Sequence, residues 1–149
     1  IMGDFEMRTD NAANKEIVTK FLEGFWTGEP EKSLALCSDD AVWTFQKSLR
    51  SPRYASVPNA LDWLNKTLVS GFDRDSGYKI VVHNVVSDGE EAAIEYTATG
   101  TTIRGELYEN NYLVRFTVRE SEIISVRPYF DTHYVNERLA ELPLLDPNF

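Results

Sequence analysis

Three ionisable side chains of this sequence have the types and positions that proton-transfer chemistry requires. Asp131 and His133 stand two residues apart directly after a strand-like run, and Glu95 interrupts an otherwise uncharged stretch, residues 92–102. A carboxylate at the mouth of a pocket can act as general acid or base, with a histidine as its proton partner. A carboxylate facing a hollow would be desolvated, which raises its pKa toward the range useful for proton transfer. Both places therefore carry candidate catalytic residues.

Each candidate also has a purely structural explanation. Asp131 can cap a following helix by accepting backbone N–H bonds, and His133 would then lie in the first turn of that helix. Strand alternation puts Glu95 on the same face as Glu91 and Thr97, opposite a more apolar face. Glu95 would then lie on the outside, in a dimer interface or in a ladder of ion pairs with arginines of neighbouring strands. Both readings stay open at this point.

Aromatic and amide side chains form a candidate ligand-binding wall. Tyr96 belongs to the apolar face of its strand, and the even-numbered residues of the strand after it share that face. A buried tyrosine or asparagine needs a hydrogen-bond partner, and a ligand oxygen serves as well as a protein group. The two tryptophans in the set are core or pocket wall rather than reactive groups. The predicted substrate-binding residues are Tyr96, Asn110, Tyr112, Phe116, Trp43 and Trp63.

Helices in the first half of the chain and strands in the second must position these side chains. Helical periodicity predicts helices at residues 12–26, from Pro30 onward, and at 58–68, and residues 46–57 are expected to be loop. The remaining expected elements are strands at 41–45, 78–86, 91–101, 108–118 and 123–130, and a last helix at 132–142. This order predicts an α+β fold in which a curved antiparallel sheet wraps around helices and forms a cone-shaped pocket.

Composition limits the classes of protein to which the chain can belong. One domain over residues 12–142 is expected, with a flexible N-terminus at 1–11 and a tail at 143–149. The net charge of −9 argues against nucleic-acid and anionic-membrane partners. One cysteine and two histidines predict no metal site, and no cofactor is expected. The lack of a signal peptide and of a membrane-length apolar run predicts a cytoplasmic protein.

Several short motifs, taken in their order, resemble a known family. The motifs are FLEGFWTGE, SDDAVWTF and IEYTATGT, then Tyr108-x-Asn110-x-Tyr112 and Arg127-x-Tyr129-x-Asp131-Thr132. Over residues 12–140 the chain is similar to the nuclear transport factor 2-like superfamily, which has a cystatin-like α+β fold. Within it the chain resembles the SnoaL-like polyketide cyclase branch, which is related to ketosteroid isomerase.

The resemblance implies an enzyme of the lyase or isomerase type. Its substrate would be a hydrophobic cyclic or polyketide-like molecule, its chemistry cofactor-independent proton transfer, and its assembly a homodimer through the outer sheet face. Phe21, Phe45 and Val114 stand where ketosteroid isomerase carries its tyrosine, its general-base aspartate and its second acid. Pro128 stands where many SnoaL-like proteins carry an acid, and a proline there also predicts a strand edge or bulge.

Two other functions remain open beside the enzyme. The loss of the familiar catalytic residues favours a non-catalytic domain that binds a small molecule in the hollow or a protein on the outer sheet face. A purely structural dimerisation domain is the third hypothesis, and it would be favoured if side chains fill the hollow.

Overall fold

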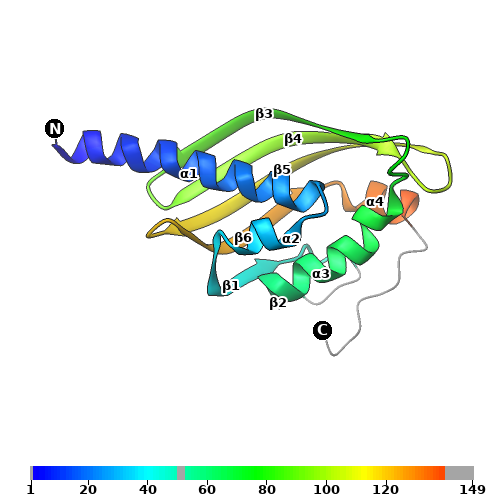
Figure 1. Ribbon diagram of the computed structural model, residues 1–149, viewed down its shortest axis with the longest axis horizontal. Coiled ribbons are helices and arrows are strands. Elements are labelled where there is room, and N and C mark those ends of the chain that lie inside the picture. The colour runs from blue at the N-terminus through cyan, green and yellow to red at the C-terminus, as the bar shows by residue number, and fades with distance from the viewer. Residues whose placement is uncertain (1, 50–52, 140–149) are drawn as a thin grey trace.

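The long first helix lies across one face of a sheet, the two helices after it lie beside it on the same side, and the last helix lies beyond the C-terminal end of the first (Figure 1). The computed structural model describes residues 2–49 and 53–139, of which residues 2–10 are described by their backbone alone. Helix α1 begins at Met2 rather than near Ala12, so most of the segment predicted to be a flexible N-terminus is helical. The helical elements are α1 (Met2–Trp26), α2 (Pro30–Leu34), α3 (Val57–Thr67), a 3-10 turn (Val69–Gly71) and α4 (Thr132–Arg138). The predicted tail, 143–149, lies outside the described residues.

Helices α1 and α2 pack closely because a glycine stands where they meet. Ser33 of α2 is fully buried, and its hydroxyl donates a hydrogen bond of 2.6 Å to the backbone oxygen of Phe21 in α1. A Cβ on Gly24 would lie 2.6 Å from the Ser33 Oγ and 3.0 Å from its backbone nitrogen. Glycine is therefore the residue that lets the two backbones approach at this point.

Six strands form one sheet in the order β2-β1-β6-β5-β4-β3. The strands are β1 (Cys37–Thr44), β2 (Tyr54–Ser56), β3 (Tyr78–Asp88), β4 (Glu91–Thr101), β5 (Leu107–Arg119) and β6 (Glu122–Phe130). The α+β fold with helices on one face is confirmed. The expectation of a wholly antiparallel sheet is wrong for one pair, because β1 and β6 run parallel. No hairpin joins these two strands along the chain, so the direction of β1 is not fixed by a tight turn.

Strand β2 falls inside the stretch that was expected to be loop. It has three residues, all of them paired antiparallel with β1, and it lies at the edge of the sheet. A strand this short shows no alternation of apolar and polar residues, which is why the sequence pattern missed it. Ser56 at its end caps α3, since its hydroxyl accepts from the backbone nitrogen of Asn59 at 3.3 Å.

Pro128 is buried within β6, opposite Val114 of β5. Pairing between β1 and β6 reaches only as far as Val126, which lies opposite Trp43. Pro128 therefore stands beyond the last position that pairs with β1, and on that side its missing N–H costs no strand hydrogen bond. Strand β6 is an interior strand of the sheet, so the proline does not mark an edge strand, although its side toward β1 has no strand partner after Val126.

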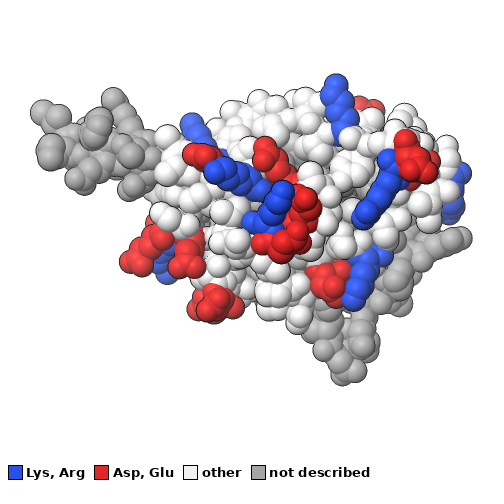
Figure 2. Space-filling view, viewed as in Figure 1, with Lys and Arg blue, Asp and Glu red and all other residues white. Residues whose placement is uncertain are grey.

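Alternation along β4 and β5 divides the sheet into an inner and an outer face. The even-numbered residues of both strands are buried, while the odd-numbered ones are half-buried or exposed. The inner face packs against α1 and α3 and makes one apolar core. Figure 2 shows acidic and basic side chains interspersed on the helix-covered side of the molecule, many of them next to a residue of opposite charge. No helix among the described residues is long and apolar enough to cross a membrane.

Candidate functional site

A small apolar cavity lies between the helices and the inner face of the sheet. Its volume is about 40 Å³, measured as the space open to the centre of a water molecule. Aromatic rings and aliphatic side chains of α1, α3, β1, β4, β5 and β6 surround it. The lining residues are Phe21, Leu22, Phe25, Trp43, Phe45, Leu49, Leu64, Leu68, Tyr96, Tyr112, Val114, Phe116, Pro128 and Phe130. The predicted hollow is therefore mostly filled by side chains, and a small space remains.

Two tyrosines supply the hydroxyl groups of the cavity wall. Tyr96 and Tyr112 stand opposite each other on β4 and β5, and their rings stack with centroids 4.9 Å apart. Trp26 Nε1 donates a hydrogen bond of 3.0 Å to the Tyr96 hydroxyl. The Tyr112 hydroxyl is hydrogen-bonded to that of Tyr108, which also accepts from Asn110 Nδ2 at 3.3 Å. The phenols thus form a buried polar group beside an apolar space.

Burial keeps these phenols protonated far into the alkaline range. Desolvation is the largest cause, and it raises the pKa of Tyr108 to about 12 and the pKa values of Tyr96 and Tyr112 above their ordinary range. A protonated phenol in a low-dielectric site is a strong hydrogen-bond donor. Among the described residues, no acceptor is seen for the hydroxyl proton of Tyr96. That proton can be donated to an oxygen atom in the cavity.

Replacing Tyr96 with phenylalanine should lower the free energy of unfolding by about 1–3 kcal/mol, because it leaves Trp26 Nε1 buried without an acceptor. Urea denaturation of the purified protein measures this change. Tyr54→Phe is the matched control, since Tyr54 is 59% exposed and its variant should stay within about 0.5 kcal/mol of the native protein. Equal stability of both variants would show that the Trp26–Tyr96 bond contributes nothing.

The structure places Asp131 and His133 at the start of α4, both exposed. The Asp131 carboxylate accepts from the backbone nitrogen of Tyr134 at 3.0 Å, which is the helix cap considered from the sequence. His133 pairs with Glu137 one turn later, at 3.1 Å. The backbone oxygen of Asp131 accepts from Asn110 Nδ2 at 3.4 Å, so Asp131 adjoins the end of the tyrosine group. Their catalytic roles stay predictions.

Glu95 lies exposed on the outer face of β4, as alternation predicted. It borders a shallow groove there, together with His83, Asn111, Leu113 and Tyr129. A bulge in β3 at His83 shifts the register, so Val85 turns toward the core although simple alternation would place it on the same face as His83. The groove and the cavity lie on opposite faces of the sheet. The structure therefore separates Glu95 from the phenols of the inner face.

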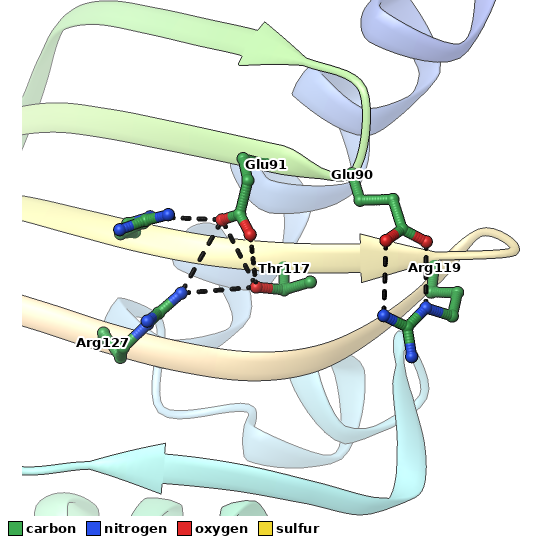
Figure 3. A network of polar contacts seen from close by, with 6 residues as sticks. Glu90, Glu91, Thr117, Arg119 and Arg127 are labelled. Carbon is green, nitrogen blue, oxygen red and sulfur yellow. Dashed lines mark hydrogen bonds and ion pairs between the residues drawn. The ribbon is translucent and has the colours of Figure 1, made fainter.

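A polar network covers the end of the outer face nearest the β3–β4 turn (Figure 3). Glu91 accepts from Arg115 at 3.1 Å, lies 3.7 Å from Arg127, and accepts from the Thr117 hydroxyl at 3.1 Å. The predicted ladder of outer-face ion pairs thus forms on Glu91 rather than on Glu95. Exposed pairs of this kind contribute about 0–1 kcal/mol each, so the network orders the surface more than it stabilises the fold.

Sequence reasoning missed a tyrosine of the site and included two residues that do not line the cavity. Tyr108 was not singled out, although it shares the inward face with Asn110 and Tyr112 and is fully buried. Asn110 does not line the cavity and instead donates to the Tyr108 hydroxyl behind its wall. Trp63 does not line it either, and its ring packs edge-on against Phe45. Among the described residues, no group of three or more His, Cys, Asp or Glu side chains could hold a metal ion.

A family model gives the relationship of the chain to known sequences. The model described as "SnoaL-like domain" matches residues 18–126. The match begins in α1 and ends in β6, so it includes the strands that carry the tyrosines. No curated protein matches the chain significantly.

Solved structures share this architecture over most of its length. A putative SnoaL-like polyketide cyclase from Jannaschia sp. CCS1 superposes with a TM-score of 0.73 at 18% identity, covering 89% of this chain and 95% of its own. An NTF2-like protein of unknown function from Burkholderia pseudomallei K96243 gives 0.70 at 13%, covering 85% and 97%. TerC, co-crystallised with polyporic acid, gives 0.70 at 16%, covering 87% and 99%. At these identities the likeness establishes the shared fold and leaves activity open.

Proposed function

Because the chain belongs to the SnoaL-like domain family, we propose that its interior cavity binds a small, neutral, mainly apolar molecule whose oxygen atom accepts a hydrogen bond from Tyr96 or Tyr112. One observation carries the proposal, namely protonated phenols placed in the wall of an otherwise apolar cavity. Ligand sites of proteins have this character, with a few polar groups that fix orientation in an apolar surround. No carboxylate or imidazole of the described residues lines the cavity.

The size of the cavity limits its occupant. A site of about 10–15 Å³ holds one water molecule, so 40 Å³ has room for a few. A cavity lined by apolar groups stays dry, and its filling by an apolar molecule is favourable in free energy. A ring-sized ligand would need lining side chains such as Leu49 to move. The complex of TerC with polyporic acid supports ligand binding in this fold.

Matched aromatic ligands test the binding. We expect 1,4-diethylbenzene and its monoketone, 4-ethylacetophenone, to bind the native protein, the ketone about three- to tenfold more tightly because of one added hydrogen bond. Calorimetric titration gives both affinities. Val114→Phe, which fills the cavity from β5, should abolish binding, while Leu113→Phe on the opposite face should not. If neither ligand binds, the cavity is only a packing defect, and the hypothesis of a purely structural dimerisation domain is favoured.

A second candidate function is cofactor-independent proton transfer on a hydrophobic cyclic or polyketide-like ketone. It is favoured by the position of Asp131, whose charge adds to the larger effect of burial in raising the pKa of Tyr108. In this mechanism the substrate would extend from the cavity past Phe130 to the exposed Asp131, which would remove a proton next to the carbonyl. Tyr96 and Tyr112 would stabilise the enolate oxygen. His133 would relay the proton to water. Glu95 could take part only from the outer groove.

Deuterium uptake by the methyl group of 4-ethylacetophenone tests this chemistry without knowledge of the natural substrate. Enolate formation exchanges those protons with solvent, and an enzyme should accelerate the exchange. Asp131→Asn should reduce the enzymatic rate about 10²-fold or more. Asparagine caps helices as well as aspartate does, so the variant keeps the α4 cap. Asp62→Asn, on the exposed face of α3, serves as the control. Exchange no faster than in buffer would show that the protein does not catalyse enolate formation, and only the binding function would remain.

The outer sheet face is the proposed surface of a homodimer. Leu113 and Tyr129 on this face are 45% and 49% exposed, and Val86 is 52% exposed. Large apolar groups gathered beside a groove are typical of a protein interface, and most dimers are two-fold symmetric. We expect Leu113→Glu to convert a dimer into a monomer at micromolar concentration, as measured by sedimentation equilibrium. Ile103→Glu, in the β4–β5 connection, should leave the dimer intact. A monomeric native protein would contradict the proposal.

A further inference from the structure

One polar atom in the cavity wall lacks a hydrogen-bond partner. Trp43 of β1 is 5% exposed and lines the cavity. Its Nε1 is buried, and no described residue accepts a hydrogen bond from it. An unpaired buried donor carries the full cost of its desolvation, so native structures keep few of them. Such a donor beside a cavity indicates a partner that enters with the ligand.

The groups around Trp43 explain why its donor is unpaired. The rings nearest to it are those of Phe21, Phe25 and Phe45, with centroids 6.3, 6.3 and 6.0 Å away. Along the sheet it lies between Val126 and Ala55. None of these side chains has an acceptor. A water molecule held in a cavity needs about two to four polar partners, and the apolar surround of Trp43 does not supply them.

Trp43 is well separated from the phenols along the sheet. Strand β6 lies between β1 and β5, so the backbones of Trp43 and of the Tyr112 strand are about 10 Å apart. Trp43 and Phe116 both stand opposite Val126 of β6, so they lie at the same height along the strands. Tyr112 lies four residues further along β5, or about 13 Å. The cavity wall therefore carries donor-bearing residues at two places, with apolar groups between them.

We propose that Trp43 Nε1 donates a hydrogen bond to a second oxygen of the ligand, and that the site thereby selects neutral molecules with two separated acceptor oxygens, such as diketones and quinones. The inference rests on the proposed ligand-binding function of the same cavity. The ligand is neutral because no cationic side chain of the described residues lines the cavity. A carboxylate would be buried there without a counter-charge.

Three ligands of nearly equal shape test the inference. They are 1,4-diethylbenzene, 4-ethylacetophenone and 1,4-diacetylbenzene, with no, one and two carbonyl groups. In the native protein the diketone should bind about tenfold more tightly than the monoketone. Incorporation of 3-benzothienylalanine at position 43 keeps the shape of indole and removes its N–H. In that protein the diketone and the monoketone should bind equally. Trp43→Phe, which needs no unnatural residue, should show the same loss of preference.

The indole proton of Trp43 gives a direct readout. In a proton–nitrogen correlation spectrum, its signal, assigned with Trp43→Phe, should move downfield with 1,4-diacetylbenzene and not with 1,4-diethylbenzene. If all three ligands bind, but the Trp43 signal does not move and the diketone keeps its preference in the benzothienyl protein, the inference is wrong and the proposed binding function stands. If none of the three binds the native protein, the proposed binding function fails, and the inference fails with it.

Discussion

Replacing Phe116 with alanine should lower the free energy of unfolding by about 3–5 kcal/mol. Phe116 lies in the middle of β5, is fully buried, and packs edge-on against Phe21 of α1 with ring centroids 5.4 Å apart. It therefore joins the sheet to the helix that covers it. Removal of its ring deletes these contacts and leaves a void that a close-packed core closes only in part. Small domains have total stabilities of about 5–15 kcal/mol, so the loss is a large fraction.

Denaturant unfolding measures the effect of Phe116→Ala, with Leu107→Ala as the control on the same strand. Leu107 is 63% exposed, and its truncation should change stability by no more than about 0.5 kcal/mol. Phe116 also lines the cavity, so its removal enlarges the cavity. If Phe116→Ala folds, it should bind 1,4-diethylbenzene more tightly than the native protein does. A loss below about 1 kcal/mol, with unchanged ligand affinity, would contradict the packing described for this ring.

Strand alternation was the strongest structural signal in the sequence. It assigned Tyr96, Asn110, Tyr112 and Phe116 to the inner face and Glu95 to the outer face, and burial in the structure agrees. The signal is strong because a shift by one residue would expose an entire apolar row. These strands are also long and joined by short connections, so their pairing follows from their order along the chain.

The features that the sequence did not predict depend on contacts between distant segments. The parallel pairing of β1 with β6 joins residues more than 80 positions apart, such as Trp43 and Val126, and no local pattern encodes it. The bulge at His83 reverses the face of Val85 although both residues suit a strand. The size of the cavity depends on how the rings of α1, β1 and β5 interdigitate. Hydrophobic pattern alone does not determine that packing.

The candidate catalytic residues show a different limit. An aspartate between a strand and a helix has the same appearance in sequence whether it caps the helix or serves a pocket, and in the structure Asp131 caps α4. The partner of a buried donor is equally invisible in sequence. Trp26 finds an acceptor on Tyr96, which is 70 positions away, whereas Trp43 finds none among the described residues. The chemistry of the site thus had to be established from the fold.

Alkaline pH should destabilise the protein by about 4 kcal/mol at about pH 11 relative to neutral pH, through three buried tyrosines. Desolvation by burial raises the pKa values of Tyr96, Tyr108 and Tyr112 above the value of about 10 that they have in the unfolded chain. Below about pH 10 both states keep these protons, and stability is unaffected. Above it, the unfolded chain releases protons that the folded protein retains, so unfolding becomes more favourable. Each tyrosine contributes about 1.4 kcal/mol per pH unit.

Unfolding by urea at a series of pH values, with phenolate absorbance followed in parallel, measures this dependence. The folded pKa of Tyr108 is about 12, so this residue lowers the stability progressively between about pH 10 and that value. Tyr108→Phe should therefore reduce the slope by about one third. Tyr54→Phe should leave the slope unchanged, because Tyr54 is 59% exposed and does not belong to the buried tyrosine group. If all tyrosines of the folded protein ionised together near pH 10, with no loss of stability, the buried phenols beside the cavity would be in contact with water. The cavity would then be a solvent-filled cleft, and a neutral ligand oxygen would have to compete there with water for the Tyr96 and Tyr112 hydroxyls.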